Sequence, residues 1–388
     1  MNAEEKSAAF RALREARTQG NRVANVRPLE IAALPKTPEW RNVDLATFHN
    51  EIIPRDRPAL MKGLVGHWPV VQAGLRSPQA LHDYLRKLDL GRPTATFIGA
   101  PEIKGNFFYR DDLSALNFER KTQPFHVTVA SILANMDRED RAAIYAPAAS
   151  AMENLPDFAG ENVLPILDPS VGPRLWVGND VTAPTHYDMS DGVAVVAAGR
   201  KRFTFFPPEQ LPNLYVGPLD LAPGGLPTSV VKLSAPDLER YPRFADALAA
   251  AETATLEPGD AVFIPNMWWH NVESLEPLNL LVNYWWFEAS KGVASPFAAL
   301  VLGLMAIPAL PESRREIWRK MFDHYVFRTG GDPVPYLPPD HRGMLGDLTP
   351  GIENYLREQM IRSLLKPVPK AAAEHILRRI VPGGGPAI

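Results

Sequence analysis

The feature that most constrains the fold is a series of short apolar segments between about residues 144 and 287. They are rich in β-branched and aromatic residues, and they run 175–178, 193–198, 202–206, 261–264 and 280–287. Gly199-Arg200 is expected to form a tight turn between the second and third segments, and residues 257–260 a turn before the fourth. Many short strands separated by such turns are typical of an antiparallel sandwich or barrel of jelly-roll type. We therefore predict a mainly β fold.

Other elements are expected on both sides of this region. Further strands are predicted at 57–63, 94–98 and 105–110. Helical spacing of apolar residues predicts flanking helices at 45–51, 77–88, 127–135, 296–305, 313–327, 351–365 and 370–380. The chain as a whole is therefore expected to be a β core with helices before and after it.

Composition excludes several classes of protein. The chain has 388 residues, of which 46% are hydrophobic and 22% charged, so a globular fold is expected. The net charge is −3 with both signs interleaved, which predicts neither a nucleic-acid partner nor a membrane-surface partner. The sequence contains no cysteine, which excludes disulfides, thiolate zinc sites and cysteine nucleophiles.

The location of the protein is predicted from its apolar segments. Residues 1–20 are charged and lack the apolar run of a secretory signal. The longest apolar stretch, 296–310, is interrupted by Gly303 and Pro308 and is too short to span a bilayer. We therefore expect a cytoplasmic protein with no membrane partner.

Three side chains that bind metals lie at spacings that suit one ion. His186 and Asp188 are two residues apart, so on a β-strand they project from the same face. His270 follows a predicted strand and is expected at its end. Two histidines and one carboxylate form the facial triad of non-haem Fe(II) oxygenases, which leaves coordination positions open. A His-X-Asp pair taken alone is more commonly a turn or a surface contact.

Lys201 strengthens the metal interpretation. It shares one face of its predicted strand with Phe203 and Phe205. A lysine on an apolar, inward face is costly unless an anion pairs with it. The far carboxylate of a 2-oxo dicarboxylate that chelates the metal would be such an anion. A solvated lysine after the turn is the alternative, and the pattern alone does not separate the two.

Two blocks of the sequence resemble the JmjC and cupin-like hydroxylases. The first runs from His186-Tyr187-Asp188 through 199–208 to Tyr215, and the second contains 258–260, 268–270 and 282–285. The similarity covers about residues 40 to 290. Within the family it is greatest to the asparaginyl hydroxylase called factor inhibiting hypoxia-inducible factor. It implies a double-stranded β-helix core, Fe(II), 2-oxoglutarate as co-substrate and O2.

The resemblance also implies roles for single residues. His186, Asp188 and His270 resemble the Fe(II) ligands, which would make them the catalytic centre. Lys201 resembles the partner of the distal carboxylate of 2-oxoglutarate. The other positions that resemble co-substrate contacts or aromatic neighbours of the site are Tyr145, Asn283 and Trp285.

Two positions depart from the family pattern. The asparagine expected six residues after the first histidine is Gly192. The threonine expected three residues before that histidine is Ala183, so Thr185 or Thr182 would have to take its place. These changes affect the expected pose of the co-substrate rather than the metal site.

We therefore predict an Fe(II)- and 2-oxoglutarate-dependent dioxygenase that hydroxylates a protein or peptide side chain or a small molecule. Asp188 argues against a halogenase, in which chloride takes the place of the carboxylate. A non-oxidative metal cupin, an isomerase or hydrolase with Zn or Mn, stays open, although Lys201 would have no use there. A catalytically silent cupin-like binding protein also stays open, but loss of a ligand is expected in it.

The predicted organisation has four parts. They are a charged N-terminal helix at 1–25, an oxygenase domain at 26–290, a helical region at 291–380 and a disordered tail at 381–388. In the helical region, Ile317, Met321 and Tyr325 form an apolar stripe that needs a partner. The resemblance implies homodimerisation through these C-terminal helices.

Overall fold

The computed structural model describes residues 31–287 and 295–365. The chain divides into two compact units, Met1–Phe287 and Glu288–Ile388. The helix expected at 1–25, the short helix expected at 370–380 and the tail at 381–388 all lie outside the described residues.

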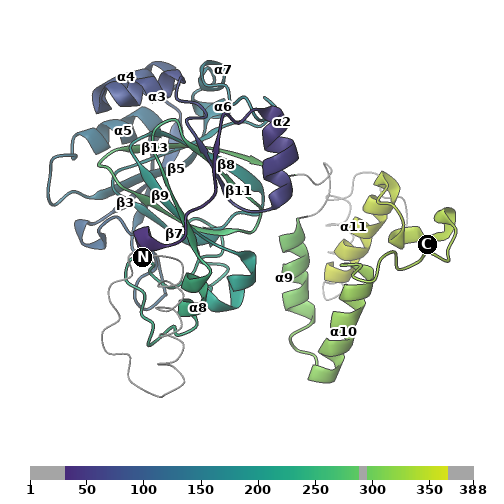
Figure 1. Cartoon of the computed structure of the whole chain (residues 1–388). Helices are drawn as coiled ribbons and strands as arrows, with labels where there is room; N and C mark the ends of the chain where they lie inside the picture. The colour runs from purple at the N-terminus through teal and green to yellow at the C-terminus, as the bar shows by residue number, and fades with distance from the viewer. Residues whose placement is uncertain (1–30, 288–294, 366–388) are drawn as a thin grey trace. The chain divides into compact units, whose positions relative to one another are not determined.

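The first unit contains two β-sheets (Figure 1). The larger has nine strands in the order β1-β2-β11-β8-β13-β6-β5-β3-β4, and the smaller has four in the order β10-β9-β12-β7. The strands are β1 (Glu39–Arg41), β2 (Ala59–Lys62), β3 (Pro93–Gly99), β4 (Glu119–Pro124), β5 (Ala143–Ser150), β6 (Arg174–Gly178), β7 (Thr182–Tyr187), β8 (Asp191–Ala198), β9 (Lys201–Phe206), β10 (Glu252–Leu256), β11 (Ala261–Ile264), β12 (Trp269–Ser274) and β13 (Asn279–Trp286).

Helices flank these sheets. The α-helices of the first unit are α2 (Leu45–Thr47), α3 (Pro69–Arg76), α4 (Pro78–Leu88), α5 (Phe125–Leu133), α6 (Ala151–Asn154), α7 (Phe158–Glu161) and α8 (Phe244–Ala249). Short 3-10 or π turns lie at η1 (Ile31–Ala33), η2 (Phe48–Ile52), η3 (Ile53–Arg55), η4 (Pro101–Ile103) and η5 (Pro208–Asn213). The mainly β core with flanking helices confirms the predicted jelly-roll class.

Alternation along the strands separates three apolar layers. On β8, Val193 and Val195 face outward and pack with α3, α4 and α5. Ala194 and Val196 face inward and pack with Phe205 of the opposite sheet. A third layer, with α8, covers the outer face of the four-stranded sheet. The interior between the two sheets is therefore the space that the inward side chains of β7, β9 and β12 share.

Two sequence predictions need correction. Gly199-Arg200 does form a turn, with Gly199 at φ +70, but β8 and β9 belong to different sheets. The turn therefore carries the chain from one sheet to the other and does not close a hairpin. The strand predicted at 105–110 is wrong: the segment is a loop with only single bridges at Asn106 and Tyr109. Its backbone at Gly105 (φ +75) passes too close to Asp180 for a side chain.

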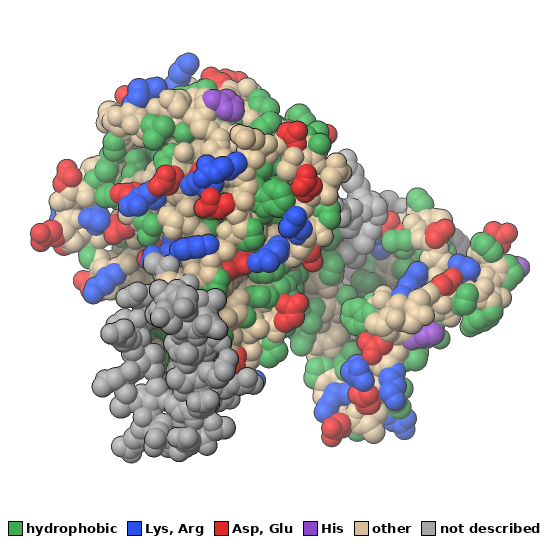
Figure 2. Space-filling view, in the orientation of Figure 1, with side chains coloured by type: hydrophobic (Ala, Val, Ile, Leu, Met, Phe, Trp, Pro, Cys, Tyr) green, Lys and Arg blue, Asp and Glu red, His purple; other side chains and the backbone are tan. Residues whose placement is uncertain are grey.

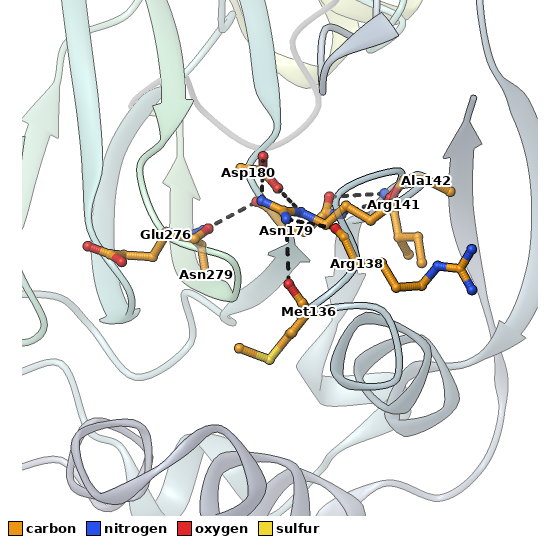
Figure 3. A network of polar contacts seen from close by, with 9 residues as sticks. Met136, Arg138, Arg141, Ala142, Asn179, Asp180, Glu276 and Asn279 are labelled. Atoms are coloured by element: carbon orange, nitrogen blue, oxygen red, sulfur yellow. Dashed lines mark hydrogen bonds and ion pairs between the residues drawn. The ribbon is translucent and has the colours of Figure 1, made fainter. Parts of the chain in front are cut away.

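A polar network ties the β6–β7 turn to its neighbours (Figure 3). The Arg141 guanidinium donates to both carboxylate oxygens of Asp180 at 2.9 and 3.0 Å. The Asn179 amide accepts from the Ile144 backbone N–H and donates to the Ala142 carbonyl. Asn279 at the start of β13 donates to the Asn179 carbonyl. The network therefore sets where β5 and β7 begin relative to each other.

The second unit is helical. Its described elements are α9 (Pro296–Ala306), α10 (Glu312–Tyr325), α11 (Pro350–Leu365), η6 (Pro339–His341) and η7 (Gly343–Leu345). Many of their large apolar side chains are exposed, among them Leu304, Met305, Ile317, Trp318 and Met321. A search of the described helices finds none with the length and apolarity needed to span a membrane.

Candidate metal centre

The structure brings His186, Asp188 and His270 together. One ligand atom from each lies within 4.8 Å of the other two. β7 and β12 pair antiparallel with His186 directly opposite His270, and the two imidazole centroids are 4.4 Å apart. Asp188 follows the last residue of β7, and its backbone carbonyl accepts from Met267 N–H. Strand pairing therefore brings the two histidines together, and the residue that follows β7 supplies the carboxylate.

The backbone fixes the orientation of both imidazoles. Nδ1 of His186 lies 2.7 Å from the carbonyl oxygen of Pro184, and Nδ1 of His270 lies 3.0 Å from that of Trp268. A carbonyl only accepts, so each Nδ1 carries the proton and donates, which leaves the Nε2 lone pair free. Such a hydrogen bond is the usual support of a metal-bound histidine.

Burial disfavours protonation of His270. The His270 side chain is 3% exposed, and this burial, followed by the charge of His186, lowers the pKa of His270 to about 4. His270 Nε2 lies 3.8 Å from Asp188 Oδ2. Two imidazoles beside one carboxylate form a donor set that fits a divalent cation of the Fe(II) class, with coordination positions left for other ligands.

Trp285 holds the carboxylate. Its indole Nε1 donates to Asp188 Oδ2 at 3.0 Å, the same oxygen that lies 3.8 Å from His270 Nε2. Gly192 lies opposite Trp285 on the neighbouring strand. A Cβ on Gly192 would lie 3.1 Å from Trp285 Cδ1 and 3.4 Å from Nε1. The glycine at this departure from the family pattern therefore makes room for the indole.

Lys201 lies inside the barrel. It is 3% exposed, and it pairs across β9 and β12 with Ser274, whose hydroxyl accepts from its ammonium at 2.8 Å. Phe205, four residues along the same face, pairs with His270, so Lys201 and His270 share that face. Burial lowers the pKa of Lys201 to about 7. The inward orientation predicted from the strand pattern is thus present, and the solvated alternative does not apply.

Other predicted contacts lie around the same interior. Burial and the charge of Asp188 raise the pKa of Tyr145, whose ring stacks on Phe107. The Thr185 hydroxyl and Asn283 Oδ1 are buried and have no hydrogen-bond partner among the described residues. Buried polar atoms of folded proteins nearly always have a partner, so Asn283 Oδ1, on the face of β13 that carries Trp285, is available to a bound molecule. Thr185 directly precedes His186 on β7, so its side chain projects to the opposite face of the sheet.

Sequence reasoning missed three features of the site. Ser274 as the partner of Lys201 and Trp285 as the donor to Asp188 both depend on strand register. Trp176, whose indole N–H is buried without a partner among the described residues, lies edge-on to Trp285. No signal in the sequence marks the roles of these residues, because their partners lie far away along the chain.

Comparison with known proteins identifies the family. The model of the cupin-like domain matches residues 45–292, and the chain belongs to that family. It is 26% identical to tRNA wybutosine-synthesizing protein 5 of Mus musculus over 320 residues, 73% of this chain and 92% of that protein.

Two other relatives match over shorter segments. Lysine-specific demethylase JMJ31 of Arabidopsis thaliana is 38% identical over 114 residues, 29% of this chain. HSPB1-associated protein 1 of Homo sapiens is 39% identical over 114 residues, also 29% of this chain. The chain spans 20% of the length of the former and 22% of the latter.

Proposed function

We propose that the protein is an Fe(II)- and 2-oxoglutarate-dependent oxygenase with His186, Asp188 and His270 as metal ligands. The observation that carries the proposal is Lys201: a buried ammonium on the face of His270, bonded to a hydroxyl and to no carboxylate that the described residues show. Keeping a cation there without an anion is costly, and the far carboxylate of 2-oxoglutarate removes the cost. A non-oxidative metal cupin has no use for that lysine.

Each protein group has a separate task in this proposal. The Nε2 atoms of the two histidines and the carboxylate of Asp188 hold the metal. Lys201, with Ser274 beside it, binds the distal carboxylate, and we assign the Tyr145 hydroxyl to the same carboxylate. The phenyl rings of Phe203 and Phe205, both nearly fully buried, exclude water.

With Fe(II) and 2-oxoglutarate bound, the centre supplies an oxidative decarboxylation. One atom of O2 enters succinate as CO2 leaves, and the other enters a C–H bond of the substrate as a hydroxyl group. The protein contributes orientation and a dry pocket to this chemistry.

For the substrate we favour a protein or peptide side chain over a nucleic acid or a small metabolite. Figure 2 shows lysine, arginine and acidic side chains interspersed on the face that it draws, and the net charge is −3. Such a surface lacks the single-sign field that favours a polyanion. Hydroxylation, as in the asparaginyl hydroxylases, is our specific proposal. Cytoplasmic location and homodimerisation through α9–α11 remain predictions beside it.

One experiment tests the oxygenase. Full-length protein is incubated with Fe(II), O2 and 2-oxoglutarate, and succinate is measured for the wild type and for Asp188→Ala. We expect succinate, even uncoupled from substrate, from the wild type only. If the wild type forms no succinate and binds neither metal nor 2-oxoglutarate, the oxygenase proposal is wrong. In that case a metal-independent binding protein becomes the better account.

A further inference from the structure

A second cavity of about 150 Å³ lies outside the metal centre. Its lining includes Phe108, Tyr109, Val230, Lys232, Arg240 and Tyr241. Pockets for whole small molecules are usually about 300–1,000 Å³, so this one suits a single side chain. It is formed by the loop that the sequence wrongly predicted to be a strand and by the long insertion between β9 and β10.

Both walls of this cavity are attached to β7, the strand that carries His186. Asn106, which begins the first wall, bridges to Thr182 at one end of β7. Thr228, just before the second wall, bridges antiparallel to His186 itself, and Ser229 N–H donates to the Thr185 carbonyl. A molecule in this cavity is therefore held at a fixed offset from the metal centre.

Tyr109 marks the cavity as a binding site. The side chain is 1% exposed, and its hydroxyl has no hydrogen-bond partner among the described residues. Burial raises the pKa of Tyr109 to about 12, so the phenol keeps its proton and can donate. A buried hydroxyl of this kind is unfavourable unless a ligand completes its hydrogen bonds.

The rim combines aromatic rings with cations. Lys232 Nζ lies 5.5 Å from the Phe108 ring centre, and the Arg240 guanidinium lies 5.3 Å from the ring of Tyr241. Two carboxylates are also present, but Asp111 pairs with Lys232 at 3.8 Å and Asp237 accepts from the Arg240 backbone N–H. With Arg110 the lining carries three cations against these two acids. The lining therefore has one cation in excess, which suits a single carboxylate.

We propose that this cavity anchors an aromatic side chain of a polypeptide substrate whose neighbouring residue is acidic. The ring fills the space between Phe108 and Val230, the Tyr109 hydroxyl bonds the segment, and Lys232 or Arg240 pairs with the acid. Aromatic anchors in such pockets commonly dominate the affinity of protein interfaces. This inference rests on the proposed function, because it places the anchor beside a substrate residue that the metal centre modifies.

The strand geometry predicts the offset between the two sites. Thr228 forms an isolated bridge to His186, and Val230 lines the cavity two residues later, about 7 Å further along an extended chain. Adding the spacing between neighbouring strands, an extended peptide covers the gap with roughly two to four residues. The modified residue is therefore expected about two to four positions from the aromatic anchor.

The test uses fluorescein-labelled dodecapeptide pools, degenerate except for a central pair: Phe-Asp, Ala-Asp, Phe-Lys or Ala-Lys. Binding to the full-length protein is read by fluorescence anisotropy, with oligouridylate of twelve nucleotides as the nucleic-acid probe. We expect the Phe-Asp pool to bind at least about tenfold more tightly than the Ala-Lys pool. Val230→Trp, which fills the cavity, should abolish the difference. Leu75→Trp, which adds the same indole on the exposed face of α3, should preserve it.

A charge-reversed variant gives a second readout. Lys232→Glu with Arg240→Glu should shift the preference from Phe-Asp to Phe-Lys, and thermal unfolding confirms that each variant is folded. Equal binding of all four pools by the wild type, or unchanged preference in Val230→Trp, overturns the proposal. So does tighter binding of oligouridylate than of Phe-Asp.

Because binding is read without turnover, the two proposals fail separately. Selective binding with no succinate formed contradicts the oxygenase alone, while succinate with no selectivity contradicts the anchor cavity alone. In peptides that gain one oxygen atom, mass spectrometry should locate it about two to four residues from the phenylalanine. An oxygen at random distances from the phenylalanine would contradict the predicted offset.

Discussion

The indole N–H of Trp285 donates to Asp188 Oδ2 at 3.0 Å, and the side chain that makes this bond occupies space left by Gly192. Asp188 is thus held from β13, a strand of the opposite sheet from β7. This relationship links the departure from the family pattern at Gly192 to the orientation of a metal ligand. The Asp188 carboxylate is therefore already hydrogen-bonded before any metal binds.

Removing this donor should weaken metal binding. We expect Trp285→Phe to lower the affinity for Co(II) by about 10- to 100-fold, the usual effect of losing a hydrogen bond to a metal ligand. Isothermal titration and the visible spectrum of the Co(II) protein report it without turnover. Trp286→Phe, the same change at the next residue, whose ring packs on Phe263 instead, is the matched control. Equal affinities for the two variants would contradict the role of Trp285.

Restoring the family's asparagine should not improve the site. In Gly192→Asn the new Cβ lies 3.1 Å from Trp285 Cδ1, so the indole has to move by a few tenths of an ångström, and we expect this to weaken its hydrogen bond to Asp188. We expect a loss of Co(II) affinity similar to that of Trp285→Phe. The double variant should show little further loss, because both changes remove one interaction. Additive losses in this double-mutant cycle would mean that Gly192 and Trp285 act independently.

The buried ammonium of Lys201 should lower the stability of the protein without ligand, although it serves to bind 2-oxoglutarate. Replacing it with Met removes a buried ammonium, and we expect the free energy of unfolding at pH 6 to rise by about 1–4 kcal/mol. The folded pKa of about 7 lies below the ordinary lysine value of 10.5, so between these two pH values the unfolded state holds the extra proton. Wild-type stability therefore rises with pH across that window, and the advantage of the variant shrinks.

Denaturant unfolding at pH 6 and pH 10 measures the stability difference, and 2-oxoglutarate titration shows the lost affinity. Lys232→Met, at an exposed lysine, is the control and should change stability by no more than about 0.5 kcal/mol. A Lys201→Met protein less stable than the wild type at pH 6 would show that the ammonium is stabilised by something other than a ligand.

The affinity for 2-oxoglutarate should depend on pH through the same lysine. Below the pKa of about 7 the ammonium is already charged and the affinity is constant. Above it, binding must also take up a proton, so the affinity should fall about tenfold per pH unit until the pKa of the complex is reached. In Lys201→Arg, which stays protonated, this slope should disappear. A flat wild-type profile between pH 7 and pH 9 would contradict the assignment.

The exposed apolar side chains of α10 should mediate self-association. Trp318→Glu with Met321→Glu places charges on the exposed apolar face of this helix, and we expect a dimer to become a monomer in sedimentation velocity. Lys320→Glu changes charge on the same helix without removing apolar surface and is the control. A wild-type protein that sediments as a monomer would contradict the prediction of a homodimer.

The local pattern was sufficient for part of the site. The spacing of His186 and Asp188 and the alternation of Lys201 with Phe203 and Phe205 predicted which side chains share a face. These inferences succeed because a strand's side-chain period is set by its own backbone. The prediction of a strand at 105–110 was wrong. The segment is a loop in which three consecutive aromatic side chains are all buried, and its backbone turns at Gly105.

The sequence by itself determined the β-rich class, the candidate ligands and the inward lysine, since each follows from periodicity over a few residues. Only the tertiary structure decided that Ser274 accepts from Lys201, that Trp285 holds Asp188, and that the loop at 108–111 and the insertion at 230–241 enclose a second cavity. The reason is physical. Each of these contacts joins residues tens or more positions apart, and strand register and turn paths that no local pattern specifies bring them together.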